Sequence, residues 1–232
     1  MPLAPHPALT AFTTEAEALA AALSGLPEER FDAPTRCVPW TLRDLLGHVH
    51  MTIGRVPGML AAPAPADGDG ALVTAAGYYR PDERFSAATN AVRVDGAREL
   101  AAGFGSGREL VRELAAGCAR VAAAVAAEPA DRRVRTRHGD PMTLDDFMTT
   151  RVVELAVHGL DAAEALGRPA WLTDRAAEVV LGLLFAGGQR AALAATGWDP
   201  VTCLAKATGR AGLNDTEREI VSVHGIRWLA LG

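Results

Sequence analysis

The chain has 232 residues, of which 49% are hydrophobic and 22% charged, and its formal net charge is −5. This balance can bury a substantial core, which excludes an intrinsically disordered chain. Basic residues gather on no segment, so a phosphate-binding surface is missing and we expect no nucleic-acid partner.

The composition also bears on the cellular compartment. The strongly apolar stretch 179–188 is shorter than the roughly 20 residues that cross a membrane. Residues 1–5 carry neither a basic region nor an apolar one, so no secretory signal is visible. The three cysteines, Cys37, Cys118 and Cys203, are widely separated and make neither a disulfide framework nor a Cys-x-x-Cys pair. We therefore expect a cytoplasmic protein without membrane contacts.

Apolar spacings of three and four in an alanine- and leucine-rich chain predict a mainly α-helical fold. A first helix is expected over residues 9–23. Thr41, with Asp44 three residues later, predicts the start of a second helix that ends at Pro57-Gly58. Residues 61–107 read as a long connection, helical in part of 85–100. Such a connection favours a four-helix bundle with a long crossover.

The remaining elements follow in chain order. A third helix is predicted over 106–127, a short extended or hairpin insert over 134–142, and a fourth helix from a cap at Thr143 to residue 166. Further helices are expected over 173–195, over 201–208 and near residue 216. We divide the chain into a metal-binding bundle, 1–168, and a small, mostly helical C-terminal extension packed on it, 169–232.

One helical stripe could carry chemistry. At about 100° per residue, Arg151, Glu154, His158 and Asp161 share one narrow face of the fourth helix. Glu154 and His158 are four residues apart and can approach one atom, which suits an ion such as zinc at about 2 Å. The alternative is that this stripe is simply the solvated side of an amphipathic helix.

The second helix offers His48, at the edge of its apolar stripe, and His50 on the other edge. A lone histidine in either place is commonly a structural or surface residue. Periodicity does not choose between the two as a metal ligand.

Two motifs resemble those of a known family. Residues 40–49 are similar to the Trp-[Thr/Ser]-x-x-[Asp/Glu]-Leu-x-x-His signature of the mycothiol-dependent maleylpyruvate isomerase N-terminal domain, in the DinB/YfiT-like metalloenzyme superfamily. Residues 154–161 resemble its second signature, Glu-x-x-x-His-x-x-Asp. The resemblance spans residues 9–166. Residues 207–210, Ala-Thr-Gly-Arg, and 228–232 resemble the ends of actinobacterial members, but the tail differs from the α/β domain of the isomerase itself.

The resemblance implies a DinB-like fold and names His48, Glu154 and His158 as ligands of one divalent metal, zinc by preference. Two neutral imidazoles and one carboxylate leave a coordination position open, as in catalytic zinc sites. A metal can deprotonate a thiol bound at that position. No cysteine has a ligand-like setting, so we expect an external thiol as cosubstrate. In the family this is mycothiol, and Lys206 as the single lysine indicates a high-GC genome that fits a mycothiol-making bacterium.

The sequence therefore predicts an enzyme that transfers the thiol to, or isomerises, an electrophilic small molecule. Two alternatives stay open: a thiol-independent metalloenzyme acting on a specialised metabolite, and a non-catalytic small-molecule-binding module. The chain is expected to be a monomer or a homodimer.

Neighbouring residues have weaker candidate roles. Asp161 and Asp44 could each orient a ligand imidazole. Asp44 is also explained as a helix-start residue, and Asp161 as a surface charge. Arg151 could hold a substrate carboxylate or only pair with Glu154. Further binding candidates in the connection are Tyr78, Tyr79, Arg80 and Arg84, whereas His6, His138 and His224 are expected to be incidental.

Overall fold

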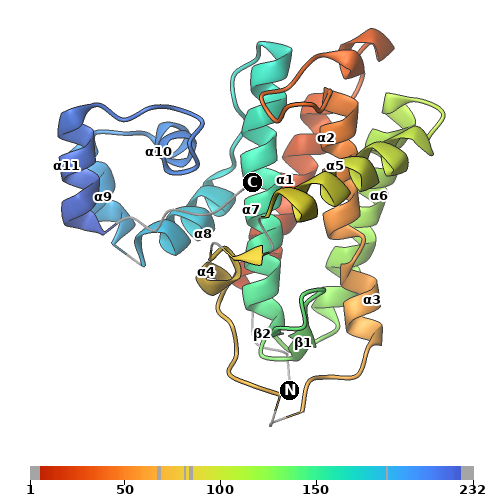
Figure 1. Ribbon diagram of the computed structural model, residues 1–232, viewed down its shortest axis with the longest axis horizontal. Helices are drawn as coiled ribbons and strands as arrows, with labels where there is room; N and C mark the ends of the chain where they lie inside the picture. Colours follow the sequence, from red (N-terminus) through yellow and green to blue (C-terminus); the bar gives the residue numbers. More distant parts are fainter. Residues whose placement is uncertain (1–5, 67–68, 81, 84–85, 187, 226–232) are drawn as a thin grey trace.

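Four long helices form a bundle that holds most of the buried residues. They are α1 (Pro7–Leu23), α2 (Leu42–Ile53), α6 (Gly107–Ala126) and α7 (Leu144–Leu166). In the computed structural model, which describes residues 6–66, 69–80, 82–83, 86–186 and 188–225, α1 and α2 each pack against both α6 and α7 (Figure 1). The predicted mainly helical fold is confirmed, and each of these helices lies within a few residues of its expected range.

The crossover between α2 and α6 contains three further helices, α3 (Val56–Ala61), α4 (Ala75–Tyr78) and α5 (Ala87–Ala102). The long connection and its partly helical character are confirmed. The expected helix end at Pro57-Gly58 is wrong, because α2 ends at Ile53 and Pro57 stands in the first turn of α3. A first-turn proline needs no intrahelical N–H partner, so it can begin a helix as well as end one.

Helix α5 crosses directly over α2, next to the candidate ligand His48. Gly47 makes this close crossing possible: a Cβ atom there would collide with the carbonyl oxygen of Ala97 and press on Ala101. The absence of a side chain at Gly47 therefore brings the backbone of α5 onto α2.

A short antiparallel hairpin precedes α7, where the sequence predicts an extended or hairpin insert. It pairs β1 (Arg133–Arg135) with β2 (Pro141–Thr143), and Val134 lies opposite Met142. Thr143, at the end of β2, accepts a hydrogen bond from the backbone of Asp146 and caps α7, as predicted. The hairpin thus fixes where the site-bearing helix begins.

The C-terminal extension contains α8 (Asp174–Phe185), α9 (Gln189–Thr196), α10 (Pro200–Ala207) and α11 (Asp215–His224). Helix α8 packs on α1 and α7, while α9 and α11 pair with each other in a lobe beside the bundle (Figure 1). The single helix expected over 173–195 is wrong: α8 ends at Phe185, and Ala186 takes a left-handed φ of 50°. A short 3-10 helix, η1 (Glu28–Asp32), follows α1.

The described helices are short or polar compared with membrane-spanning ones. No single one of them is long and apolar enough to cross a bilayer, and α8 with α9 reaches that length only as a pair bent by 93°.

Candidate metal centre

The polar stripe of α7 is buried. Arg151 is 1% exposed and Asp161 is 0% exposed, and both Glu154 and His158 are largely covered. The alternative that this stripe is the solvated side of the helix is therefore wrong. Helix α7 lies against α1, α2, α8 and α10, so neighbouring helices cover its polar face as well as its apolar one.

His48, Glu154 and His158 converge on one point. Glu154 Oε2 lies 3.2 Å from His48 Nε2 and 3.5 Å from His158 Nε2. The two imidazole rings meet edge to face, with centroids 5.0 Å apart. One donor atom from each of the three residues falls within 4.8 Å of the others. The structure thus brings together two side chains of α7 and one of α2, 106 residues apart in sequence.

Asp161 orients His158. The Nδ1–H group of His158 donates to Asp161 Oδ2 at 3.0 Å, which leaves Nε2 turned toward Glu154. Arg210 holds the same carboxylate from the C-terminal extension, donating from Nε to Oδ1 at 3.0 Å and from Nη2 to Oδ2 at 2.8 Å. This bidentate arginine–carboxylate fork holds the Asp161 carboxylate in position and keeps it ionised.

The charges of the site follow from its burial and its hydrogen bonds. Burial lowers the pKa of His48 to about 4, against the opposing effect of Glu154. Burial alone would raise the pKa of Glu154, but hydrogen bonds from His158 and His48 and the charge of Arg151 hold it well below the usual value. Burial also favours neutral His158, yet hydrogen bonds to Asp161 and Glu154 raise its pKa well above 6.5. The centre is therefore built around an ionised carboxylate.

This donor set suits a divalent metal such as zinc. Two imidazole nitrogens and one carboxylate oxygen are borderline ligands of the kind zinc prefers, and three protein ligands leave room for a further one. The Nδ1–H bond from His158 to Asp161 holds the ring so that Nε2 faces the shared point, where a metal ion can take the place of the Nε2 proton. Lone pairs of Nε2 and of Glu154 Oε2 repel unless a proton or a cation lies between them. The residues present therefore fit such an ion.

The loop 33–41 closes one side of this centre. Its fold is fixed by backbone bonds from Thr35 N–H to Trp40 O (3.0 Å) and from Leu42 N–H to Ala33 O (2.8 Å). The loop stacks the ring of Trp40 on that of His48, with centroids 4.8 Å apart. The stacked ring keeps water from one face of His48.

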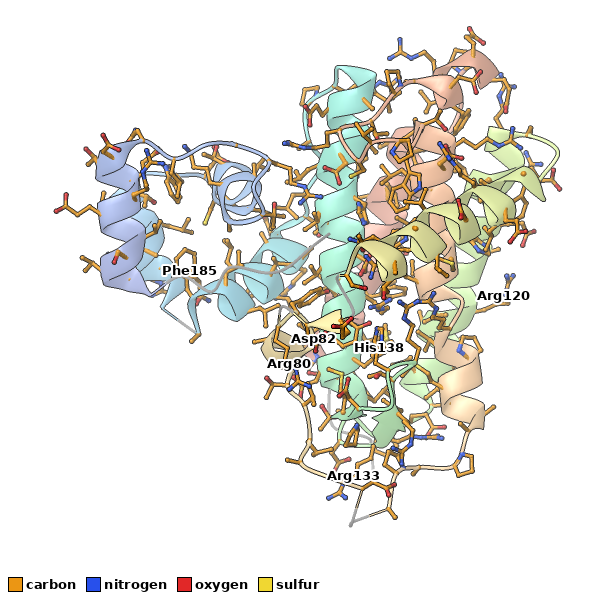
Figure 2. The ribbon with its side chains drawn as sticks, in the orientation of Figure 1. Arg80, Asp82, Arg120, Arg133, His138 and Phe185 are labelled. Carbon is orange, nitrogen blue, oxygen red and sulfur yellow. The ribbon has the colours of Figure 1, made fainter. Side chains whose placement is uncertain are left out.

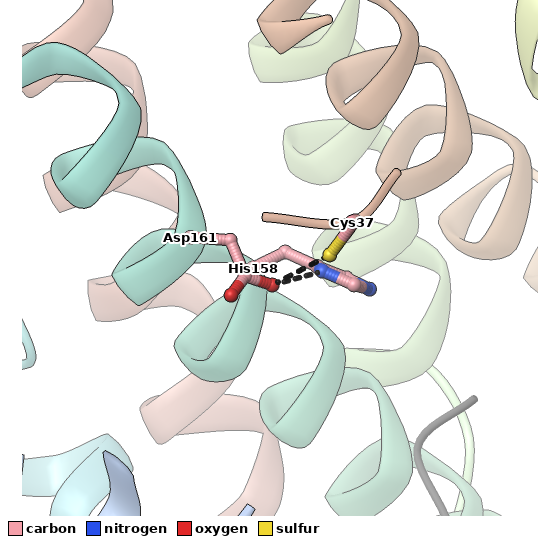
Figure 3. Close-up of side chains that lie close together, drawn as sticks. All are labelled: Cys37, His158 and Asp161. Carbon is pink, nitrogen blue, oxygen red and sulfur yellow. Dashed lines mark hydrogen bonds and ion pairs between the residues drawn. The ribbon is translucent and has the colours of Figure 1, made fainter. Parts of the chain in front are cut away.

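The same loop brings a cysteine into the site. Cys37 Sγ lies 3.3 Å from Asp161 Oδ2 and donates to it (Figure 3), and Cys37, His158 and Asp161 form a second group of clustered donor atoms. The expectation that no cysteine has a ligand-like setting is wrong for Cys37. Arg210 already neutralises Asp161, however, so this second group is less suited to a cation than the first.

The other two cysteines are core residues. Burial raises the pKa of Cys118 to about 12 and, with the charge of Asp199, that of Cys203 to about 11. Both stay protonated thiols at neutral pH and are unreactive.

Two sequence candidates have other contacts. The Asp44 carboxylate accepts from the backbone N–H and the hydroxyl of Thr41 and lies 3.8 Å from Arg98, so it caps α2. The ring of His50 contacts Phe104, 5.6 Å between centroids. Between the two histidines of α2, the structure thus places His48 at the centre.

Arg151 is enclosed beneath the site. Its guanidinium donates to Thr150 Oγ1 and to the carbonyl of Thr52, packs 4.7 Å from the ring centroid of Phe147, and lies 3.8 Å from Glu154 Oε1. These contacts favour pairing with Glu154 over direct capture of a substrate carboxylate.

The candidates of the crossover divide between core and cavity. Tyr79 is buried and donates to the carbonyl of Thr150, and burial raises its pKa well above 10. Tyr78 lines the cavity and packs near His138, which lines the same cavity, so the expectation that His138 is incidental does not hold. Arg80 pairs with Asp82 (Figure 2).

Two of the remaining residues lie away from the centre, and the third is not among the described residues. Arg84 is outside the described residues, His6 bonds to the carbonyl of Glu128, and His224 lies at the end of α11.

A cavity of about 200 Å³ opens beside the three histidine and glutamate donors. Arg55, Arg93 and Arg137 also line it, and sequence reasoning missed them because they come from separate elements and form no motif. Arg210 belongs to the C-terminal segment that resembles actinobacterial family members. Its pairing with Asp161 leaves no signal in the sequence.

The profile of the mycothiol maleylpyruvate isomerase N-terminal domain family matches residues 12–163. This chain belongs to that family. The match includes His48, Glu154, His158 and Asp161 and ends before Arg210.

Two curated relatives are uncharacterised proteins of Mycobacterium tuberculosis, from strains CDC 1551 / Oshkosh and H37Rv. Each is 35% identical to this chain over 169 residues, which cover 72% of this chain and 60% of the relative. This chain thus aligns with somewhat less than two thirds of their length. No solved structure matches significantly.

Proposed function

We propose that this protein is a divalent-metal-dependent enzyme that activates a low-molecular-weight thiol for transfer to, or isomerisation of, an electrophilic small molecule. The observation that carries the proposal is the convergence of His48, Glu154 and His158 beside a cavity. Membership of a family named for mycothiol supports mycothiol as the thiol. The donor set favours zinc.

The metal, when bound, supplies a positive centre that lowers the pKa of a coordinated thiol and so provides a thiolate at neutral pH. Two imidazoles and a carboxylate from the protein neutralise only part of its charge. The protein therefore favours an anionic sulfur at the remaining position.

The surrounding residues keep the ligands in place. Asp161 holds the Nδ1 proton of His158, and Arg210 holds Asp161. Arg151, fully enclosed, keeps Glu154 ionised, and Trp40 limits water at His48. These contacts preorganise the three donors before any reactant binds.

The cysteines inside the chain do not supply the reacting thiol in this proposal. Cys118 and Cys203 are buried and protonated, and Cys37 donates to Asp161. A thiol from solution reaches the cavity instead, and a reduced cytoplasm is the compartment where such thiols are abundant.

The test is conjugation of mycothiol to monochlorobimane by purified protein, followed by fluorescence. We expect turnover that falls on chelation, returns with zinc, and drops more than about 100-fold in His158→Ala, since loss of a residue that merely orients a ligand already costs about 10- to 100-fold. His224→Ala, on α11, is the matched control.

Turnover that survives both chelation and His158→Ala would refute the proposal. A metal-loaded protein that conjugates no thiol would instead favour a thiol-independent reaction at the same centre.

A further inference from the structure

Tyr78 is anchored beside the candidate metal centre through the residues that precede it. It is the last residue of α4. The backbone N–H of Val73 donates to the carbonyl of Pro141 in β2 at 2.8 Å. The backbone N–H of Ala75 donates to Asp146 Oδ1, in the first turn of α7, at 2.9 Å. The position of Tyr78 is therefore fixed relative to α7, the helix that carries two of the three candidate ligands.

The ring of Tyr78 packs against α7. Its centroid lies 5.3 Å from that of Tyr79 and 6.4 Å from that of Phe147, and both contacts are edge to face. The guanidinium carbon of Arg151 lies 6.0 Å from the same centroid, and its Nη2 lies 3.8 Å from Glu154 Oε1. One guanidinium group thus stands between Tyr78 and a candidate metal ligand.

The hydroxyl groups of the two adjacent tyrosines have different partners. The Tyr79 hydroxyl donates to the carbonyl of Thr150 at 3.1 Å and lies in the core. The Tyr78 hydroxyl accepts a hydrogen bond from Arg151, because a guanidinium has only donors. Among the residues that the structure describes, no group accepts the proton of the Tyr78 hydroxyl. That proton is therefore available to a ligand.

The charge of Arg151 strengthens Tyr78 as a hydrogen-bond donor. Burial opposes this charge, but Glu154 and, less strongly, the two tyrosines raise the pKa of Arg151 above its usual value. The guanidinium therefore stays positive beside the Tyr78 oxygen. When a ligand draws the phenolic proton toward itself, negative charge builds up on that oxygen, and the adjacent cation stabilises it.

The cavity is small enough for one ligand to meet both Tyr78 and the candidate metal ligands. Its volume is about 200 Å³, below the roughly 300–1,000 Å³ of pockets for drug-sized molecules. Tyr78 lines it together with His48, Glu154 and His158. A small electrophile that fills this cavity contacts the three donors and the phenol at the same time.

We propose that the Tyr78 hydroxyl donates a hydrogen bond to the electrophile oxygen on which negative charge develops when the thiol sulfur adds to a carbon–carbon double bond conjugated with a carbonyl. In that step a sulfur–carbon bond forms, and the electron pair of the double bond moves through the conjugated system onto the carbonyl oxygen. Donors aimed at such a developing oxyanion are a principal source of catalysis. Tyr78 is thereby assigned as a catalytic residue. The inference rests on the proposed function for the identity of the attacking sulfur.

The same hydrogen bond serves both outcomes of the addition. For isomerisation, the former double bond rotates as a single bond, the sulfur–carbon bond breaks, and the electron pair returns from the oxygen. For transfer, the enolate carbon takes up a proton from water, which balances the proton that the thiol released. In both cases Tyr78 stabilises the charged oxygen and keeps its own proton.

The first test is binding in the absence of both metal and thiol. The probe is 4-nitrophenolate, a small molecule with an anionic oxygen, whose absorbance reports its charge and its binding. It is titrated at pH 8 into chelator-treated protein, as wild type and as Tyr78→Phe. We expect Tyr78→Phe to bind it about tenfold more weakly, the usual cost of losing a hydrogen bond to a charged group. Nitrobenzene, which has no anionic oxygen, should bind equally to both proteins.

Tyr79→Phe is the matched control. It removes the neighbouring hydroxyl and its hydrogen bond to the carbonyl of Thr150, so it should lower the unfolding temperature. It should leave the affinity for 4-nitrophenolate unchanged. Unfolding temperatures also show that Tyr78→Phe is folded.

The second test compares two electrophiles in the conjugation of mycothiol by zinc-loaded protein. Methyl vinyl ketone develops charge on its oxygen, whereas monochlorobimane releases chloride and needs no oxyanion donor. Tyr78→Phe should lower kcat for methyl vinyl ketone about 100-fold, as loss of one oxyanion donor does. It should affect the reaction of monochlorobimane much less and leave KM for mycothiol unchanged.

Equal affinity of wild type and folded Tyr78→Phe for 4-nitrophenolate, or no binding by the wild type, overturns the proposal. So does an equal fall in rate with both electrophiles, since Tyr78 would then act on the thiol or on the fold. If Tyr78→Phe weakens 4-nitrophenolate binding but the wild type conjugates neither electrophile, the hydrogen-bond donor stands and the thiol chemistry of the proposed function is refuted.

Discussion

Two buried carboxylates on different sides of α7 have opposite properties. Asp161 is 0% exposed and Glu15, on α1, is 1% exposed. Burial raises the pKa of Glu15, and the hydrogen bonds from the backbone and hydroxyl of Thr173 offset this only in part. Burial acts on Asp161 in the same direction, but His158 and Arg210 reverse it and hold its pKa well below 3.8.

The contrast shows that the partners, and not the depth of burial, decide the charge of a carboxylate in this fold. Glu15 joins α1 to the start of α8 and has structural partners that are neutral. Asp161 has a guanidinium, an imidazole and a thiol around it, all within reach of the candidate metal centre. An ionised carboxylate at this place can orient the metal-ligand candidate His158. Substitutions at Asp161, Arg210 and Glu15 test the contrast between the two carboxylates.

The largest effect is expected for Asp161→Asn. The amide cannot accept from His158 and Arg210 as the carboxylate does, so His158 loses its orienting partner and Arg210 its counter-charge. Zinc affinity should fall about 10- to 100-fold, measured by competition with a chromogenic chelator. Asp215→Asn, on the exposed face of α11, is the matched control. An unchanged affinity in folded Asp161→Asn would mean that Asp161 does not support the centre.

A smaller effect is expected for Arg210→Ala. Arg210 acts on the centre only through Asp161, so zinc affinity should fall less than in Asp161→Asn, by about threefold to tenfold. Arg210→Lys keeps the charge but loses the fork, and it should recover part of the affinity. Equal losses in the alanine and lysine variants, with no loss in Asp161→Asn, would contradict this order.

The smallest effect concerns the pH dependence of stability at Glu15. Its pKa in the folded state is raised, so the folded state binds more protons, and Glu15 contributes stability below about pH 4.5 that is lost as the pH rises through its raised pKa. Each unit of pKa shift corresponds to about 1.4 kcal/mol. Glu15→Gln lacks this titration.

The measurement is urea unfolding of wild type and Glu15→Gln between pH 4 and pH 8. The free energy of unfolding of Glu15→Gln relative to wild type should increase with pH over this range. Glu17→Gln, an exposed residue of the same helix, should show no such trend. A constant difference between Glu15→Gln and wild type would show that the Glu15 pKa is not raised.

The sequence was sufficient to predict most helices of the bundle, because the signals that mark helices are local. Caps at Thr41 and Thr143 and the three-to-four spacing of apolar residues depend only on neighbouring residues, and the structure confirms both helix starts. The break at Ala186 was missed because the apolar pattern continues across it from α8 into α9. Periodicity alone does not detect a helix end at a left-handed residue when that residue is not a glycine.

The candidate site was predictable only in part, for a physical reason. The helical spacing of Glu154 and His158 places them on one face. The prediction that His48 joins them at one metal site depended on a family resemblance. Contacts that depend on tertiary folding were not visible: Cys37 arrives on a loop and Arg210 on the extension, 124 and 49 residues from Asp161. The cavity-lining arginines Arg55, Arg93 and Arg137 come together in the same way, from three elements with no shared motif.

Zinc stoichiometry is the most direct test of the central claim that His48, Glu154 and His158 bind one metal ion. Protein dialysed against zinc and then against metal-free buffer is analysed for bound metal, as wild type and as the His48→Ala, Glu154→Ala, His158→Ala triple variant. We predict one zinc per chain in the wild type and none in the triple variant, with His50→Ala retaining the wild-type value. Zinc retained by a folded triple variant, or absent from the wild type, would contradict the account.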